Sequence, residues 1–148
     1  MIVRIATTNE EIRSCHPVMR QLRPAYGPDE LVAKIRRQEP DGYRLALLID
    51  EGEVVAVAGY RISENLAWGK FLYVDDLVTD AERRSKGYGR RLLEWLAATA
   101  REAACDELHL DSGVQRFGAH RFYLLQGMNI TSHHFQLGLP ARPVPPSC

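Results

Sequence analysis

The amino-acid sequence predicts an α+β fold in which a mixed sheet carries helices on both faces. Two observations support this prediction. Short runs that alternate between apolar and polar residues are interspersed with amphipathic helical segments, and the longest of these segments lies between two strand-like runs. A helix in that position crosses over between two parallel strands. The predicted order of elements is therefore β-α-α-β-β-β-α-β-α-β.

The first half of the chain supplies two helices and a three-stranded meander. Residues 1–6 alternate and predict a strand, and Thr7 and Thr8 each precede a glutamate by three residues, which predicts a capping box at a helix start. Pro17 is expected to kink or restart that helix, because its ring removes an amide donor. A second helix is expected over residues 29–38. The meander strands are expected over residues 43–49, 54–62 and 68–78.

The second half adds a long helix that ends near Ala104 and a strand over residues 107–112. A short helix over residues 118–126 is expected to stop at Gly127, and one or two last strands are expected within residues 130–139. The proline-rich tail, residues 140–148, is expected to be extended and exposed. We find no repeat or linker, so residues 1–148 are predicted to form one domain.

Composition narrows the class of protein and of partner. The 148 residues are 45% hydrophobic and 26% charged, and 19 basic residues balance 19 acidic ones. This balance gives no electrostatic reason to expect nucleic acid as a partner, and no apolar run approaches the ~20 residues that a membrane helix needs. The three cysteines are widely spaced and no signal-peptide pattern opens the chain, which favours the cytoplasm. The five histidines lack the spacing of metal ligands, so no metal is expected.

The sequence centres on a cationic glycine turn between a strand and the long helix. Residues 84–89 read Arg-Ser-Lys-Gly-Tyr-Gly, and the helical pattern begins directly after them. Unpaired N–H groups and the positive end of the helix dipole meet there, which suits a phosphate or pyrophosphate. A tight turn without a ligand is the alternative. A dinucleotide fingerprint would need glycine at Leu92, and a Walker loop would need its lysine after Gly87 rather than before it.

This turn resembles the Arg/Gln-x-x-Gly-x-Gly/Ala signature of the GNAT N-acetyltransferase superfamily. Further on, Ala119-x-x-Phe122-Tyr123-x-x-x-Gly127-Met128 is similar to the second motif of that family, Ala-x-x-Phe/Leu-Tyr-x-x-x-Gly-Phe. The resemblance extends over roughly residues 1–139. It implies a GNAT-type fold with a central splayed sheet and a bound acetyl-CoA whose pantetheine arm enters the gap between two strands.

The resemblance also implies which residues contact acetyl-CoA. Main-chain contacts to the pantetheine arm are expected from the end of the strand before the loop, at Leu77, Val78 and Thr79. Ser85 departs from the family pattern, which often has glycine there, and narrows the backbone freedom of the loop. Pyrophosphate contacts are expected from the loop and the helix start: Arg84, Ser85, Lys86, Gly87, Tyr88, Gly89 and Arg90.

Acetyl transfer to an amine requires a base for the amine, whose ordinary pKa is about 10, and is helped by an acid for the leaving thiolate. By resemblance Tyr123 is the candidate acid and Asp75 the candidate base, while a core aromatic and a solvated carboxylate are the alternatives. Asp75 and Asp76 are neighbours on a strand, so only one of them is expected to face the cleft. Asp76 is then expected on the other face, capping a group or pairing with an arginine.

The predicted function is transfer of the acetyl group of acetyl-CoA to a primary amine by direct attack in a ternary complex. Tyr26, Asp111 and Ser112 are candidate residues of the acceptor pocket. Tyr26, Glu64, Asp75 and Asp111 would give it an acidic character that suits a small cationic amine. A protein amine as acceptor, a non-catalytic acyl-CoA sensor and a nucleotide-binding regulatory domain stay open. A homodimer is one expected state, although the sequence leaves the oligomeric state open.

Overall fold

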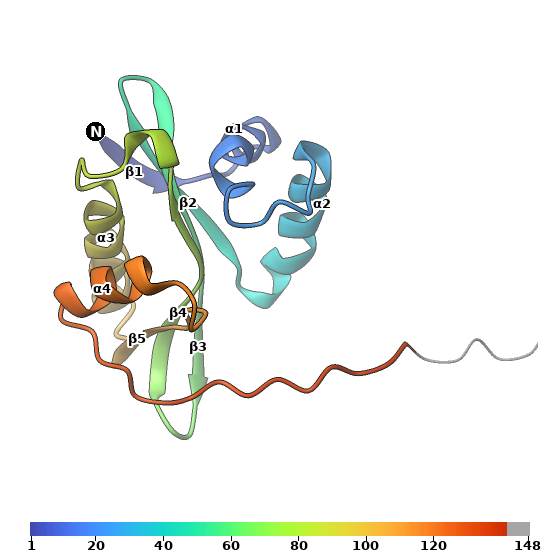
Figure 1. The fold of residues 1–148 in the computed structure, drawn as a ribbon. Coiled ribbons are helices and arrows are strands. Elements are labelled where there is room, and N and C mark those ends of the chain that lie inside the picture. Colours follow the sequence, from blue (N-terminus) through green and yellow to red (C-terminus); the bar gives the residue numbers. More distant parts are fainter. Residues whose placement is uncertain (142–148) are drawn as a thin grey trace, which may run out of the picture. The chain divides into compact units, whose positions relative to one another are not determined.

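Five strands form one mixed sheet in the order β1-β2-β3-β4-β5 (Figure 1). The computed structural model describes residues 1–141. The pairs β1–β2, β2–β3 and β3–β4 are antiparallel. Strand β5 runs parallel to β4, because the long helix crosses over between them. This arrangement confirms the predicted α+β class. The strands are β1 (Ile2–Ile5), β2 (Arg44–Asp50), β3 (Glu53–Asn65), β4 (Gly69–Thr79) and β5 (Glu107–Leu110).

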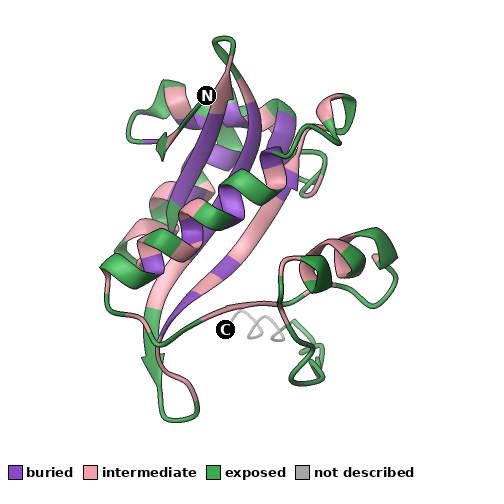
Figure 2. Cartoon of the chain, turned by 90° about the vertical axis from the view of Figure 1, so that its left-hand side faces the viewer, coloured by how far each residue is buried: buried purple, intermediate pink, exposed green. Residues whose placement is uncertain are grey.

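Helices cover both faces of the sheet, as predicted. Helices α1 (Asn9–Met19) and α2 (Pro28–Gln38) lie on one face, and α3 (Tyr88–Glu102) lies on the other (Figure 1). In β2, Leu45 and Leu47 belong to the core beneath α1 and α2, and the intervening residues are also buried, so this strand is covered on both faces. Figure 2 shows α3 lying across strands that are buried through much of their length.

Helix α1 begins as the sequence predicted and does not break where it was expected to. The Thr8 side chain accepts a hydrogen bond from the Glu11 N–H, and the Glu11 carboxylate accepts one from the Thr8 N–H, which completes the capping box. The helix continues through Pro17 and ends two residues later, at Met19. The prediction that the helix restarts at Pro17 is therefore wrong. Two short 3-10 helices, η1 (Glu39–Asp41) and η2 (Ala81–Arg83), follow α2 and β4.

The chain divides into two units, Met1–Asp111 and the residues from Ser112 on. The second unit contains α4 (Phe117–Leu125), and Gly127 follows it with φ of 87°, the left-handed conformation expected of a glycine that ends a helix. Across residues 1–141, none of the helices combines the length and the apolar character that crossing a bilayer requires.

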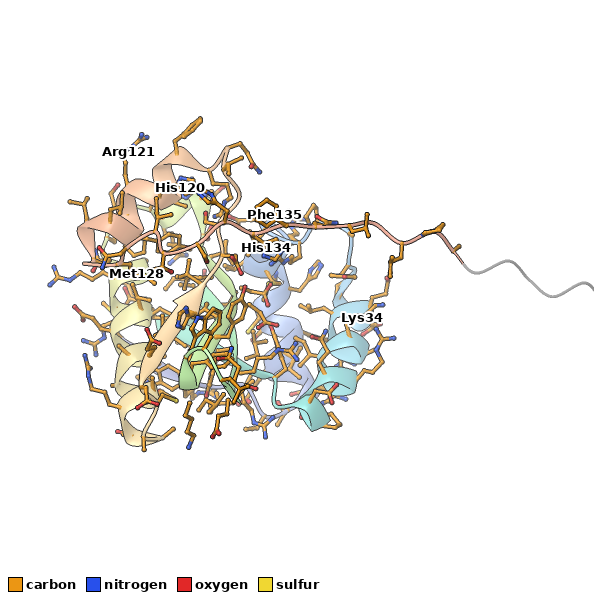
Figure 3. All side chains as sticks on the ribbon, turned by 90° about the horizontal axis from the view of Figure 1, so that it is seen from below. Lys34, His120, Arg121, Met128, His134 and Phe135 are labelled. Carbon is orange, nitrogen blue, oxygen red and sulfur yellow. The ribbon has the colours of Figure 1, made fainter. Side chains whose placement is uncertain are left out.

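The prediction of one or two strands within residues 130–139 is wrong. These residues are extended but form no ladder with any strand of the described chain, and alternation of apolar residues makes a strand only where a partner supplies hydrogen bonds. Figure 3 shows Phe135 on this extended segment, and its side chain is exposed. Of the predicted tail, residues 142–148 lie outside the described residues.

Candidate active site

The turn before α3 has the conformation that an anion-binding loop needs. Ser85 has φ of 68° and Gly87 has φ of 79°, so both lie in the left-handed region. Gly87 is the N-cap of α3, and no side chain caps the helix there. The first turn contains no acidic residue and carries Arg90 and Arg91. A helix start that has unpaired N–H groups and added positive charge is stabilised by a bound anion.

Not all of the residues predicted to contact the pyrophosphate have side chains that are free to do so. Arg84 and Lys86 are exposed at the turn, and Arg90 is exposed but paired with Glu94 at 2.9 Å. Gly89 lies within the first turn of α3 and does not take a positive φ, so its backbone conformation does not require glycine. What these residues share is a set of main-chain N–H groups at one helix start.

Tyr88 was predicted to contact the cofactor, but its side chain is buried. The Tyr88 hydroxyl donates a 2.6 Å hydrogen bond to the Asp50 carboxylate at the end of β2. This hydrogen bond raises the pKa of the Tyr88 phenol and lowers the pKa of Asp50. Tyr88 therefore fixes the start of α3 to the sheet, and only its main-chain N–H is left for a ligand.

Strand β4 has an unpaired edge that leads toward this turn. On one side β4 pairs with β3 as far as Thr79, but on the other side its pairing with β5 covers only residues 71–74. Over residues 75–79, which we call the open edge of β4, main-chain groups that face away from β3 have no strand partner within residues 1–141. The predicted contact residues Leu77, Val78 and Thr79 lie on this edge, beyond the point at which β5 ends.

A β-bulge in β4 corrects the prediction for the two aspartates. Gly59 pairs with Asp76 and Tyr60 pairs with Val74, so Asp75 is an extra residue that has no counterpart on β3. The strict alternation of side chains fails at such a bulge. Both Asp75 and Asp76 line the same cavity, and the expectation that only one of them would face it is wrong.

This cavity, which we call the β4 cavity, has a volume of about 340 Å³ and lies between β4 and the two N-terminal helices. Its wall is partly apolar and partly charged, as is common for sites that bind small polar ligands. Among the predicted pocket residues, Tyr26 lines it. The lining residues are Met19, Arg23, Tyr26, Leu31, Lys34, Ile35, Gln38, Tyr43, Tyr73, Asp75 and Asp76.

Both carboxylates of the β4 cavity are held by arginines. Arg23 donates to one oxygen of Asp76 at 2.7 Å, which confirms the expected pairing of Asp76 with an arginine. Arg61 donates to Asp75 through Nε at 3.0 Å and through Nη2 at 2.9 Å. Two donors on one carboxylate fix its orientation as well as its charge. The negative charge of the cavity is therefore already matched by positive charge.

Tyr43 joins the two ion pairs. Its hydroxyl donates a 2.8 Å hydrogen bond to the second oxygen of Asp76, and the Arg61 guanidinium lies 5.5 Å from the centre of its ring. Burial raises the pKa of the Tyr43 phenol well above its ordinary value, and the Asp76 carboxylate adds to the rise. A Cβ on Gly59 would lie 1.9 Å from the Tyr43 hydroxyl and 2.5 Å from an Asp76 oxygen. Glycine at this position is therefore what makes room for the network.

The remaining predicted pocket residues lie elsewhere. Asp111 follows β5 and accepts a hydrogen bond from the hydroxyl of Tyr73, which itself lines the β4 cavity. Ser112 opens the second unit. Glu64, near the end of β3, is not among the lining residues of the cavity. Within residues 1–141, no group of three or more His, Cys, Asp or Glu side chains is arranged to hold a metal ion.

The candidate acid Tyr123 lies on α4, in the second unit. Its ring packs against that of Phe122 with centroids 5.5 Å apart. Burial raises the pKa of the Tyr123 phenol, and the Arg116 guanidinium opposes this rise. A phenol with a raised pKa keeps its proton at neutral pH, as an acid must. The role itself stays a prediction from the motif.

Sequence reasoning missed the arginines that bind the carboxylates. Arg23 lies between α1 and α2, Tyr43 directly precedes β2 and Arg61 lies on β3, and no motif links them to Asp75 or Asp76. One available signal was the segment 24–28, which contains two prolines and the predicted pocket residue Tyr26 and which Arg23 directly precedes.

Known proteins resemble this chain over most of its length. The model of the acetyltransferase (GNAT) family matches residues 7–128. The Bacillus subtilis (strain 168) protein named "Uncharacterized N-acetyltransferase YhdJ" is 33% identical over 132 residues, which cover 88% of this chain and 93% of that protein. The Salmonella typhimurium aminoalkylphosphonate N-acetyltransferase is 32% identical over 98 residues, 66% of this chain and 62% of that enzyme.

Solved structures share the fold at low sequence identity. A protein described as a putative acetyltransferase from Agrobacterium tumefaciens str. C58 superposes with a TM-score of 0.81 at 23% identity, over 94% of this chain and 100% of that one. AAC(6')-Iy, solved with the bisubstrate analog CoA-S-monomethyl-acetylneamine, superposes with a TM-score of 0.83 at 12% identity, over 95% and 98% of the two chains.

Proposed function

The chain belongs to the GNAT acetyltransferase family and is an acetyltransferase, and we propose that it moves the acetyl group of acetyl-CoA to a primary amine in the β4 cavity. The observation that carries this proposal is the position of the open edge of β4. At residue 79 this edge leads toward the uncapped start of α3, and at Asp75 it borders the cavity. One extended ligand along the edge would thus have an anion site at one end and an acceptor site at the other.

The cofactor is proposed to bind mainly through the main chain. The N–H groups at the start of α3 suit the pyrophosphate, with Arg84 and Lys86 adding charge. The unpaired groups of Leu77, Val78 and Thr79 suit the amides of the pantetheine arm, because an extended chain of amides satisfies a strand edge as another strand would. An N–H group on the same edge would stabilise the negative charge that develops on the acetyl oxygen.

The chemistry is proposed as direct attack within a ternary complex. The lone pair of the amine nitrogen forms a bond to the thioester carbon, the carbon–sulfur bond breaks, and the sulfur leaves with the bonding pair. The Tyr123 hydroxyl is the proposed donor of a proton to that sulfur. The proton lost by the amine passes to a water bound by Asp75. Because Arg61 holds Asp75 by two donors, this carboxylate is suited to orient such a water.

The structure changes what we expect of the acceptor. Of the residues expected to make the pocket acidic, Asp75 and Tyr26 line the cavity and Glu64 does not, and both lining carboxylates are paired with arginines. These ion pairs remove the surplus negative charge on which the prediction of a small cationic amine rested. A primary amine remains the proposed nucleophile, and a relative named for aminoalkylphosphonate acetylation supports an amine. A protein amine is the alternative acceptor.

The test is release of free thiol from acetyl-CoA in the presence of a panel of amines, with the acetylated product identified by mass spectrometry. We expect Tyr123→Phe to lower kcat about a hundredfold or more while acetyl-CoA affinity is unchanged. Tyr60→Phe is the matched control, because Tyr60 is buried on β3 and packs against Trp95 with ring centroids 6.0 Å apart. Binding of acetyl-CoA without thiol release for any amine would favour the sensor function. The cytoplasmic location and the homodimer stay predictions.

A further inference from the structure

The β4 cavity holds one cation more than its ion pairs use. Four charged side chains line it: Arg23, Lys34, Asp75 and Asp76. Arg23 is engaged by Asp76, and it also donates to the main-chain oxygen of Asp75 at 3.0 Å. Asp75 is engaged by Arg61. Lys34 has no carboxylate partner among the ion pairs within residues 1–141, so it is the one charged side chain lining the cavity that is left without an ion pair.

Lys34 is held at the cavity wall by its helix. It projects from α2 (Figure 3), whose residues Leu31 and Ile35 are buried in the core and also line the cavity. The Lys34 ammonium lies 5.9 Å from the centre of the Tyr26 ring, which lines the same cavity. A lysine of intermediate exposure whose ammonium lies beside an aromatic face and has no carboxylate partner is suited to bind an anion.

We propose that the acceptor amine also carries an anionic group, a carboxylate or a phosphonate, and that Lys34 binds this group. The inference rests on the proposed function, because it takes the β4 cavity as the acceptor site. It adds the substrate class, an amine bearing an oxyacid anion, and the residue that selects it.

Charge in the cavity disfavours the other classes of small amine. A diamine or polyamine would bring a second cation beside the unpaired Lys34, while Asp75 and Asp76 are already paired with arginines. An anionic tail would pair with Lys34 instead.

The test uses matched acceptors that differ only in the tail. 3-Aminopropanoate is compared with propylamine and 1,3-diaminopropane, and 2-aminoethylphosphonate with ethylamine, by kcat/KM from thiol release. We expect the anionic member of each pair to be preferred about tenfold or more, because it adds a charge-assisted contact to Lys34. A preference within only one pair identifies the anion as carboxylate or as phosphonate.

Variants assign the preference to Lys34. We expect Lys34→Met to remove it and Lys34→Glu to favour the diamine, both without loss of acetyl-CoA affinity. Arg37→Met is the matched control, because Arg37 is an exposed cation on the same helix that does not line the cavity, and it should keep the preference. Equal kcat/KM across both pairs, or a preference that survives Lys34→Met, overturns the inference while the acetyltransferase function stands.

Direct binding keeps the inference testable if no amine in the panel is acetylated. Calorimetric titration with 3-aminopropanoate and 2-aminoethylphosphonate should then give binding that Lys34→Met weakens about tenfold and Arg37→Met leaves unchanged. Failure of both compounds to bind the unmodified chain overturns the proposal of an anionic acceptor. Binding without acetyl transfer would instead count against the proposed function.

Discussion

The turn at residues 84–89 and the β4 cavity are built in opposite ways. The turn offers main-chain N–H groups at a helix start, and its Arg84 and Lys86 side chains are exposed. The cavity offers side chains, and its aspartates are each held by an arginine, Asp76 by a tyrosine as well. One region presents the backbone in a set conformation, whereas the other presents a network of charges.

This difference bears on how an acetyltransferase separates its two tasks. Binding through the main chain depends on backbone conformation, so it tolerates many side chains provided that φ is accessible. Binding through side chains depends on which side chains pair with one another. In the β4 cavity, the paired residues Arg23 and Asp76 are 53 residues apart in the sequence. If the turn and the β4 cavity have the functions proposed above, the cofactor site is set by a short stretch of sequence, whereas acceptor choice is set by side chains that lie far apart in the chain.

The substitution expected to have the largest effect is Gly87→Val, which changes the turn and leaves the β4 cavity unchanged. A β-branched residue at φ of 79° is strained by about 2 to 3 kcal/mol, and relief of that strain would move the N–H groups of the turn. We expect acetyl-CoA affinity to fall at least tenfold by calorimetry. Gly42→Val is the control, since Gly42 has φ of 95° at the end of η1. It should lose similar stability and keep acetyl-CoA affinity. An equal loss of affinity in both variants would contradict a main-chain site at Gly87.

Gly59→Ala alters the packing of the β4 cavity and leaves the turn unchanged. The added Cβ would meet the Tyr43 hydroxyl at 1.9 Å, so the ring and the bulge must shift. We expect a loss of about 2 kcal/mol in the free energy of unfolding, measured in denaturant, and weaker acceptor binding. Acetyl-CoA affinity should be unchanged. A variant with unaltered stability and acceptor kinetics would show that the close packing of Gly59, Tyr43 and Asp76 does not matter.

Arg23→Met tests one ion pair within the network. The Asp76 side chain is 12% exposed and would keep only the Tyr43 hydrogen bond. We expect a loss of about 1 kcal/mol in unfolding free energy. The double variant Arg23→Met/Asp76→Asn should recover part of that loss, because it leaves no unpaired charge. Additive losses in the double variant would mean that the two side chains are not coupled.

The smallest expected effect is that of Ser85→Gly, which tests whether the backbone of the turn is strained at residue 85. Serine at φ of 68° is strained, and glycine relieves the strain but adds freedom to the unfolded chain. We expect the free energy of unfolding to rise by about 0.5 kcal/mol, measured by thermal denaturation, with no change in acetyl-CoA affinity. Destabilisation by Ser85→Gly would mean that the strain relieved at residue 85 is smaller than the cost of the freedom that glycine adds to the unfolded chain.

The sequence predicted the parts of the molecule that depend on local pattern. Alternating runs gave the strands, the capping box gave the start of α1 at Thr8, and the glycine pattern gave the turn before α3. Each of these features is decided within a few residues. The order of elements was correct as far as α4 for the same reason.

The parts that were missed depend on partners. The bulge that lets Asp75 and Asp76 line the same cavity follows from the register between β4 and β3. The periodicity of the sequence within β4 does not reveal that register. The strands expected within residues 130–139 needed a ladder partner, and alternation alone does not supply one. The pairing of Asp76 with Arg23 and of Asp75 with Arg61 also depends on tertiary contacts.

The most direct test of the central claim is calorimetric titration of the chain with acetyl-CoA, run beside free CoA, ATP and NAD. We expect micromolar binding of acetyl-CoA that is lost in Gly87→Val and kept in Gly42→Val. Tighter binding of ATP or NAD than of acetyl-CoA, or no binding of acetyl-CoA at all, would contradict the proposal that the turn and the open edge of β4 form an acetyl-CoA site.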